Sequence, residues 1–102
     1  MAKKKSYTMT EKVFLWSGDM AAWHFLPITK KVGIEIKEHF GKHARGFGSL
    51  RVAVTIGKTK WKTSIFPDKY SGSYVLPIKA KVRLVEDIEP GEKVTFTIPL
   101  LT

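Results

Sequence analysis

Eight cationic or titratable side chains are spread over the middle of this sequence, and their chemistry suits the binding of an anion. Arginine and lysine donate charge-assisted hydrogen bonds to phosphate and carboxylate oxygens. The stretch 30–83 carries thirteen Lys and Arg residues against three acids, in a chain whose formal net charge is +9. We interpret this excess as favouring a polyanion such as nucleic acid, with solubility alone as the alternative. The candidate anion-binding residues are Lys42, His43, Arg45, Arg51, Lys60, Lys62, Lys79 and Lys81.

A glycine-rich stretch, "GKHARGFGS" at residues 41–49, holds three of these candidates. Glycines allow backbone N–H groups to approach a ligand closely, and Arg45 can hold a phosphate or carboxylate with two parallel hydrogen bonds. We therefore consider a small anionic metabolite held around Arg45 as a second function. The alternative is a plain connection whose glycines satisfy unusual φ angles.

Aromatic residues offer a third kind of chemistry. Trp23, His24 and Trp61 are the candidate lining of a cleft for such a metabolite. The simpler interpretation places Trp23 and Trp61, together with Phe25 and Phe66, in the core. Exposed aromatic rings beside cations would instead form a platform on which nucleic-acid bases stack. A protein-interaction module is the third function considered, and an exposed apolar patch would be its sign.

Catalytic and metal-binding patterns are weak. His39 and His43 are four residues apart, but Gly41 lies between them and no third ligand follows at a local spacing. The "GKT" at residues 57–59 precedes a strand rather than a helix, which predicts a hairpin turn instead of a phosphate-binding loop. No nucleophile elbow or paired carboxylates occur, and the chain has no cysteine. We predict a non-enzymatic protein without metal or cofactor.

One phrase occurs twice in the chain. "LPITKKV" at residues 26–32 and "LPIKAKV" at residues 76–82 are identical at five of seven positions. Proline between a strand and a helix lacks an N–H group and presets φ for the first helical turn. Each phrase follows an expected strand and precedes an expected helix, a loop and another strand. We therefore predict two copies of one unit that pack about a pseudo-twofold axis and close a barrel.

The hydrophobic patterns predict mostly short strands. Strands are expected over 6–16, 21–28, 50–56, 60–66, 73–80 and 93–100, with the first two forming a hairpin. Helices are expected over 30–40, capped by Thr29 and ended by Gly41, and over 79–87. The chain is long enough for one domain, which we place at residues 7–102 after a disordered basic tail at residues 1–6. The predicted fold is a small, mostly β, double-split barrel with one or two short helices.

Several pieces of the sequence resemble a known family. They are "WHF" (23–25), "RGFGS" (45–49), "WKTSIFP" (61–67) and "YVLPIKAKVR" (74–83). In this order they resemble a family of small bacterial domains known as domain of unknown function nineteen-oh-five. The resemblance implies a double-split β-barrel and no activity. The stretch from "VLPIKAKV" to "VTFTI" is also distantly similar to the swapped-hairpin half of AbrB/MazE-type proteins, which assemble by dimerising.

The sequence gives further expectations about partners and location. Because one chain would hold both barrel halves, we expect a monomer. The longest early apolar run, Val13 to Trp16, is too short for a signal peptide, and no stretch approaches the length of a membrane span. We therefore expect a cytoplasmic protein without membrane contact.

Overall fold

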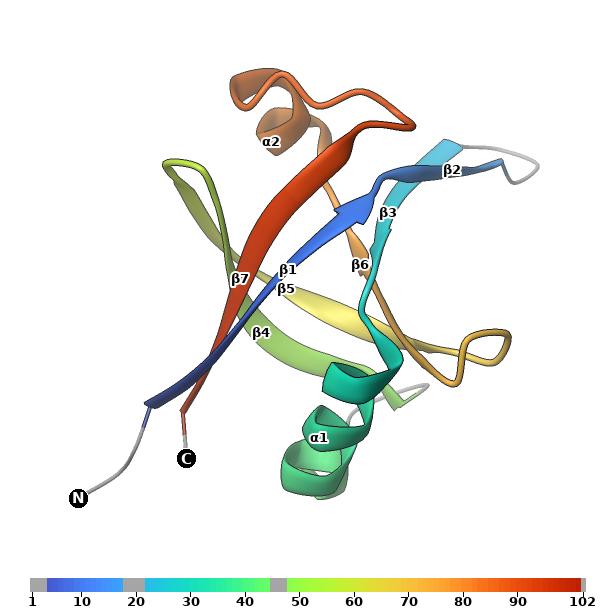
Figure 1. Ribbon diagram of the computed structural model, residues 1–102, viewed down its shortest axis with the longest axis vertical. Helices are drawn as coiled ribbons and strands as arrows, with labels where there is room; N and C mark the ends of the chain where they lie inside the picture. The colour runs from blue at the N-terminus through green and yellow to red at the C-terminus, as the bar shows by residue number, and fades with distance from the viewer. Residues whose placement is uncertain (1–3, 18–21, 45–47, 102) are drawn as a thin grey trace.

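The computed structural model describes residues 4–17, 22–44 and 48–101, whose strands form one antiparallel sheet. The sheet order is β1-β7-β4-β5-β6-β3-β2, and the sheet curves around the core (Figure 1). The strands are β1 (Lys4–Lys12), β2 (Phe14–Ser17), β3 (Ala22–Pro27), β4 (Leu50–Ile56), β5 (Thr59–Asp68), β6 (Ser73–Pro77) and β7 (Lys93–Leu101). The helices are α1 (Lys30–Phe40), which continues into the 3-10 turn Gly41–His43, and α2 (Ala80–Val85). The predicted mostly-β barrel with short helices is confirmed.

The repeated phrases lie against each other where β3 pairs with β6. Leu26 is directly opposite Leu76 in this antiparallel pair. Just beyond the pair, the isoleucine of each phrase donates its amide to the other half. These two bonds join Ile28 to Tyr74 O and Ile78 to His24 O, each at 2.9 Å. Since residues fifty apart make the same bonds in both directions, a pseudo-twofold axis passes between the two leucines, as the repeat predicted.

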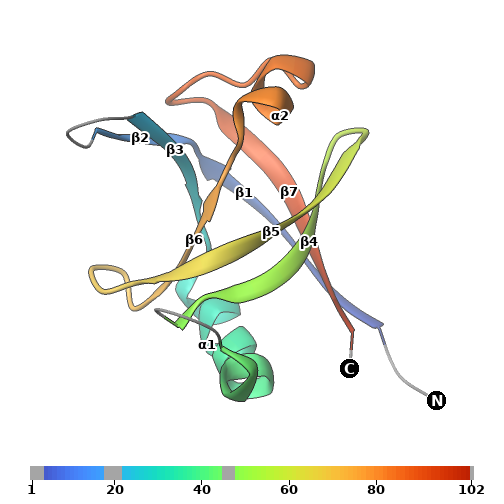
Figure 2. The same ribbon diagram turned by 180° about the vertical axis from the view of Figure 1, so that it is seen from behind.

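The two halves exchange strands around this axis. The first half contains β1, β2, β3, α1 and β4, and the second contains β5, β6, α2 and β7. The long leading strand of each half starts beside the last strand of the other half, so that β1 pairs with β7 and β5 pairs with β4. In the second half, β5 runs on from β4 to pair with β6 (Figure 2), and in the first half β2, which follows β1, pairs with β3 in the same way. This exchange is the double-split arrangement.

Two boundaries at the start of the chain differ from those predicted. Residues 4–6, expected to be disordered, belong to β1, while residues 1–3 lie outside the described part. The strand expected over 6–16 is interrupted at Val13, whose side chain is buried. The backbone of Val13 bonds instead to the turn before β7, donating to Glu92 O at 2.9 Å and accepting from Gly91 N at 2.7 Å. The interruption marks where the strand leaves β7 and joins β3.

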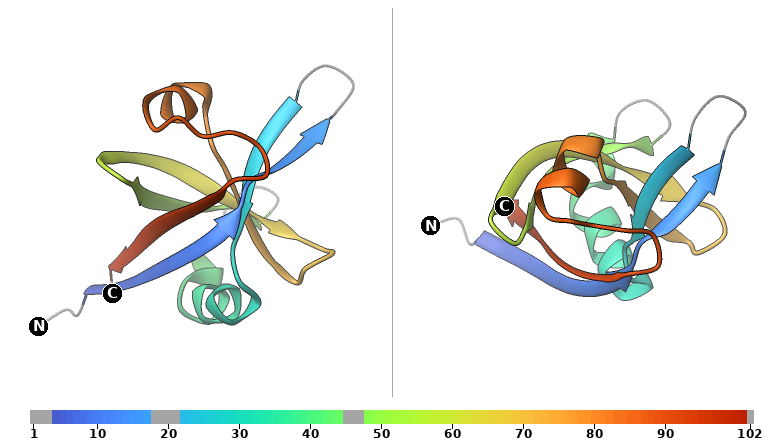
Figure 3. Two further views of the ribbon diagram at one scale, coloured as in Figure 1. Left: turned by 45° about the horizontal axis from the view of Figure 1, so that its top comes forward. Right: turned by 90° about the horizontal axis from the view of Figure 1, so that it is seen from above.

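Alternating apolar residues of the strands fill the interior. The predicted inward faces of β4 and β7 are confirmed, because Leu50, Val52, Val54, Ile56, Val94, Phe96 and Ile98 are buried. The helices close opposite ends of the curved sheet, and α2 lies over its upper opening (Figure 1, and Figure 3, right). The β4–β5 hairpin is tied to α2 because Thr59 Oγ1 donates to Glu86 Oε2 at 2.6 Å.

Helix α1 begins and ends where its sequence predicts. The Thr29 side chain accepts a hydrogen bond from the amide of Val32, which satisfies one of the free N–H groups at the helix start. Gly33 lies in the first turn, and there the helix packs directly on β6. A Cβ at Gly33 would overlap Ser73 Oγ and would lie 2.8 Å from Ser73 Cβ. The glycine therefore serves close helix–strand packing at the expense of helix propensity.

Candidate nucleic-acid interface and adjoining pocket

Three of the predicted anion-binding residues share the outer side of the β4–β5 hairpin. Arg51 lies opposite Ser64 in the strand pairing, and Lys62 lies opposite Ala53. Lys60, two residues before Lys62, points to the same side, and all three cationic side chains are exposed. The prediction that this hairpin has one core face and one basic outer face is confirmed.

The same outer side extends across β7 to β1. Lys12 and Lys93 are directly opposite each other there and both are exposed. The next positions along the strands carry threonine pairs whose hydroxyl groups bond at 2.7 and 3.0 Å. The outward positions where these four strands pair with one another carry no acid, and Asp68 of β5 lies beyond Phe66, where the strand pairs with β6. We call this surface the basic face, and its outward residues are Ser6, Thr8, Thr10, Lys12, Arg51, Ala53, Thr55, Lys60, Lys62, Ser64, Lys93, Thr95, Thr97 and Pro99.

The remaining predicted cations lie elsewhere. Lys79 precedes α2 and Lys81 lies within it, whereas Lys42 follows α1 at the opposite end of the barrel (Figure 1). Arg45 and the side chain of His43 lie outside the described residues, so a site around Arg45 stays a prediction. The described part of the predicted set therefore does not form one surface, and the basic face combines three of its members with two further lysines.

Next to the basic face, the outer side of β2, β3, β6 and the end of β5 carries aromatic residues. The exposed fractions are 50% for Trp23 and 39% for Phe66, so the core interpretation is wrong for these two rings. Trp16 on β2 is paired with Trp23 and is 55% exposed. The prediction of a core position fits Trp61, which packs against the core. We call this surface the aromatic patch, and its residues are Phe14, Trp16, Trp23, Phe25, Phe66 and Val75.

Ring contacts hold part of the aromatic patch in place. The Phe25 ring lies 5.6 Å from the Phe14 ring and 6.2 Å from the Trp23 ring, and the planes of the second pair differ by only 9°. A shallow apolar groove of about 240 Å³ follows the patch between Trp16 and Phe66. Every second residue of a strand points to the same side, so Lys60, Lys62 and Phe66 share the outer side of β5. This strand therefore connects the basic face to the aromatic patch.

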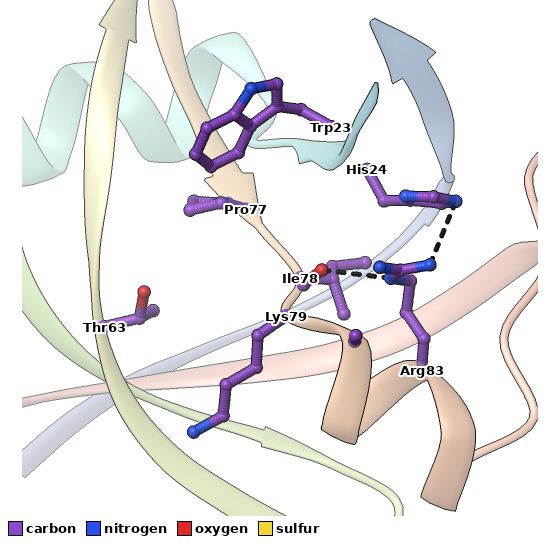
Figure 4. A pocket seen from close by; sticks show the side chains of 8 residues that line it. Trp23, His24, Thr63, Pro77, Ile78, Lys79 and Arg83 are labelled. Atoms are coloured by element: carbon purple, nitrogen blue, oxygen red, sulfur yellow. Dashed lines mark hydrogen bonds between the residues drawn. The ribbon is translucent and has the colours of Figure 1, made fainter. Parts of the chain in front are cut away.

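A separate pocket of about 390 Å³ opens where β5 and β6 diverge (Figure 4). Its walls come from β3, β5, β6 and the start of α2. The lining residues are Trp23, His24, Thr63, Pro77, Ile78, Lys79, Ala80 and Arg83. Trp23 and His24, two of the three residues predicted to line a cleft, are among them, whereas Trp61 is not. Thr63, which follows Trp61 on the same side of β5, takes that place.

Arg83 is fixed within this pocket by two hydrogen bonds. Its Nε donates to Ile78 O at 3.2 Å, and its Nη1 contacts His24 Nε2 at 3.3 Å (Figure 4). Because a guanidinium only donates, His24 Nε2 is the acceptor and the imidazole proton lies on Nδ1. Burial and the neighbouring Arg83 charge lower the pKa of His24, against a smaller opposing effect of Glu89. The imidazole is therefore neutral at pH 7, and Arg83 carries the positive charge.

Other kinds of site find no support within the described residues. No three His, Asp or Glu side chains of the described segments lie close enough together to hold a metal ion. Among the helices described, none has the length and apolar character needed to cross a membrane.

Sequence reasoning missed several residues of these surfaces. Lys12 and Lys93 each follow a glutamate and lie far from other cations in the sequence, and only the β1–β7 pairing brings them together. Arg83 did have a signal in the sequence. Fifty residues separate it from Gly33, and the same offset relates Trp23 to Ser73, so a comparison of the two repeats would have marked this position as different.

Comparison with known proteins gives a family but no activity. The family described as Domain of unknown function (DUF1905) matches residues 10–98, which include nearly all of the described strands and both helices. No curated protein matches the chain.

Proposed function

The chain belongs to the DUF1905 family, and we propose that it is a non-enzymatic module that binds single-stranded nucleic acid. The observation that carries this proposal is the continuity of the basic face with the aromatic patch along β5. Proteins that bind single strands combine a positively charged track for the backbone with aromatic rings for the bases. We further propose that it acts in the cytoplasm as a monomer, since both barrel halves occur in one chain.

The charge distribution supports contact with phosphates. Lys12 and Lys93 face each other across β1 and β7, an arrangement of like charges that destabilises a sheet. An anionic partner would remove this repulsion. Contact with phosphates releases condensed counterions. For a single strand, the logarithm of the binding constant therefore falls by about 0.7 per phosphate contact for each tenfold rise in salt concentration. Such contacts would position the strand without reading its sequence.

The exposed rings support contact with bases. Trp16 and Trp23 leave about half of their surface in water although each could bury a large apolar area. Stacking of one base on such a ring contributes about 1–3 kcal/mol and tolerates any sequence. Bases in a duplex are stacked on each other, so we expect the protein to prefer single strands.

The aromatic patch also favours a second candidate, a protein-interaction module. Exposed apolar patches commonly mark contacts with other proteins. The two candidates differ in what the basic face contributes, because an apolar protein partner would bind with little dependence on Arg51, Lys60 and Lys62.

Fluorescence anisotropy with labelled single- and double-stranded DNA and RNA over a salt series tests the proposal. The triple variant Arg51→Gln, Lys60→Gln, Lys62→Gln should make the plot of log binding constant against log salt concentration less steep, by about 2 in its slope. The matched control changes Lys30, Lys31 and Lys37 of α1 to Gln and removes the same charge from a helix outside the basic face. No detectable binding at low salt, or an equal effect of both triple variants, would overturn the proposal.

A further variant separates the aromatic contribution. Trp16→Ala should weaken single-strand binding about 5- to 100-fold and leave any weak duplex binding unchanged. If single strands bind but Trp16→Ala has no effect, the aromatic patch serves another partner, as the second candidate requires.

A further inference from the structure

The two helix–strand junctions related by the pseudo-twofold axis are built differently. In the first, α1 packs directly on β6 because Gly33 lies against Ser73. Equivalent positions of the two repeats are fifty residues apart, so Arg83 is the equivalent of Gly33, and Trp23 is the equivalent of Ser73. The second junction therefore has two of the largest side chains where the first has two of the smallest. The pocket lies at the second junction, beside Trp23 and Arg83.

The side chains in the second junction do not fill the space between them. Ser73 is 4% exposed in the first junction, whereas Trp23 is 50% exposed in the second. The indole stacks on Phe25 on one side and still lines the pocket (Figure 4). A pocket of about 390 Å³ is of the size that holds small organic ligands.

The charges of the pocket indicate an anion. Arg83 uses one Nη1 contact and its Nε–H within the protein, and it forms no ion pair with a carboxylate of the described residues. The rest of its guanidinium retains donors for a carboxylate or phosphate. Lys79 extends from the start of α2 along the other side of the pocket (Figure 4). No acid is among the lining residues, and the effect of the Glu89 charge on His24 is smaller than that of the Arg83 charge.

We infer that this pocket binds a small organic anion with a flat ring. The ring would lie against the Trp23 indole and the apolar floor of Pro77 and Ile78. Its carboxylate or phosphate would bind Arg83, with Lys79 at the rim and the Thr63 hydroxyl as a further donor. This site is separate from the basic face, and its ligand need not be part of a nucleic acid.

NMR titration of the full chain tests the inference with two defined probes, 2-naphthoate and adenosine monophosphate. The indole N–H signal of Trp23 reports on the pocket, that of Trp16, which lines only the apolar groove, reports on binding at the aromatic patch, and that of Trp61, which packs against the core, is the internal reference. We expect saturable shifts of the Trp23 signal by at least one probe, with Kd below about 1 mM. The uncharged counterparts, 2-naphthalenemethanol and adenosine, should bind about tenfold or more weakly. The two probes distinguish a carboxylate from a phosphate ligand.

Two variants and a control locate the binding. Ala80→Leu fills the pocket from the exposed start of α2 without changing charge, and it should abolish the shifts. Arg83→Gln should weaken binding about 10- to 100-fold, since a charged hydrogen bond is lost. Lys81→Gln removes one charge from the same helix outside the pocket and should have little effect. Absence of saturable binding of both probes, or unchanged binding in Ala80→Leu, would overturn the inference.

The triple variant of the basic face separates this inference from the proposed function. It should retain probe binding in the pocket while it loses nucleic-acid binding. If probe binding were lost together with nucleic-acid binding in this variant, the pocket would not be an independent site. Thermal unfolding of Arg83→Gln, compared with Ala80→Leu, shows whether a loss of affinity reflects a loss of fold.

Discussion

Replacing Gly33 by alanine should destabilise the protein, although alanine is the better helix former. In an exposed helix the change would gain about 1 kcal/mol. Here the added Cβ would overlap Ser73 Oγ and lie 2.8 Å from Ser73 Cβ and 3.1 Å from its backbone Cα. Ser73 is buried and donates through Oγ to Thr29 O at 3.1 Å, so it cannot turn aside without losing that bond.

The size of the effect follows from these opposing contributions. Overpacking a tight contact costs about 1–3 kcal/mol, and loss of the Ser73 hydrogen bond costs about another 1 kcal/mol. After subtraction of the helical gain of about 1 kcal/mol, we expect Gly33→Ala to lower the free energy of unfolding by about 1–3 kcal/mol. In a domain of this length, that corresponds to a fall in Tm of about 4–24 °C.

Urea unfolding of a double-mutant cycle with Ser73→Gly measures the contact directly. The second change removes Oγ and Cβ, so Gly33→Ala should cost at least about 1 kcal/mol less in that background. Gly41→Ala is the matched control. Gly41 has φ −56° and ψ −34°, and the nearest atom to an added Cβ is Lys37 Cγ at 3.5 Å. We expect Gly41→Ala to be neutral or mildly stabilising. If Gly33→Ala behaved like this control, the close packing of α1 on β6 would be refuted.

Two further predictions concern other contacts of the barrel. The neighbouring Glu35 carboxylate, together with burial, raises the pKa of Tyr7 from 10.0 to about 12. The folded state therefore retains this proton at a pH where the unfolded chain loses it, and stability should fall between pH 10 and pH 12. Tyr7→Phe should flatten this part of the pH profile of unfolding, and an unchanged profile would contradict the assignment. Thr59→Val removes the 2.6 Å bond to Glu86 and should cost about 1–3 kcal/mol in urea unfolding, whereas Lys58→Gln in the same turn should cost less than about 0.5 kcal/mol.

Much of the fold was predictable because its signals are local. The bounds of α1 follow from the Thr29 cap, the apolar spacing and Gly41, and the alternation in residues 50–56 gives both faces of β4. The interruption at Val13 was not predictable. It depends on hydrogen bonds to Gly91 and Glu92, about eighty residues away. The similarity to AbrB/MazE-type proteins stays a prediction.

The candidate site was less predictable, because alternation indicates the face of a residue and not what covers that face. Trp23 and Phe66 have the hydrophobicity of core residues, and their exposure follows from the absence of a covering helix over that side of the described sheet (Figure 1). The positions of Arg51, Lys60 and Lys62 were predicted together because they lie on one hairpin. Lys79 and Lys42 belong to separate ends of the barrel, which no local pattern indicates.

The positions that are identical in the two halves lie in a different part of the domain from the positions that differ most. The identical apolar positions of the repeated phrases are leucine, isoleucine and valine pairs at or near the pseudo-twofold axis. Five of their six members, Leu26, Leu76, Ile28, Ile78 and Val82, are buried to at least 97%, so both halves need the same side chains there. The positions that differ most, Gly33 against Arg83 and Ser73 against Trp23, lie at the helix–strand junctions, away from that shared core. The first junction closes by direct packing, whereas the second retains the pocket beside Arg83 in which we infer that an anion binds.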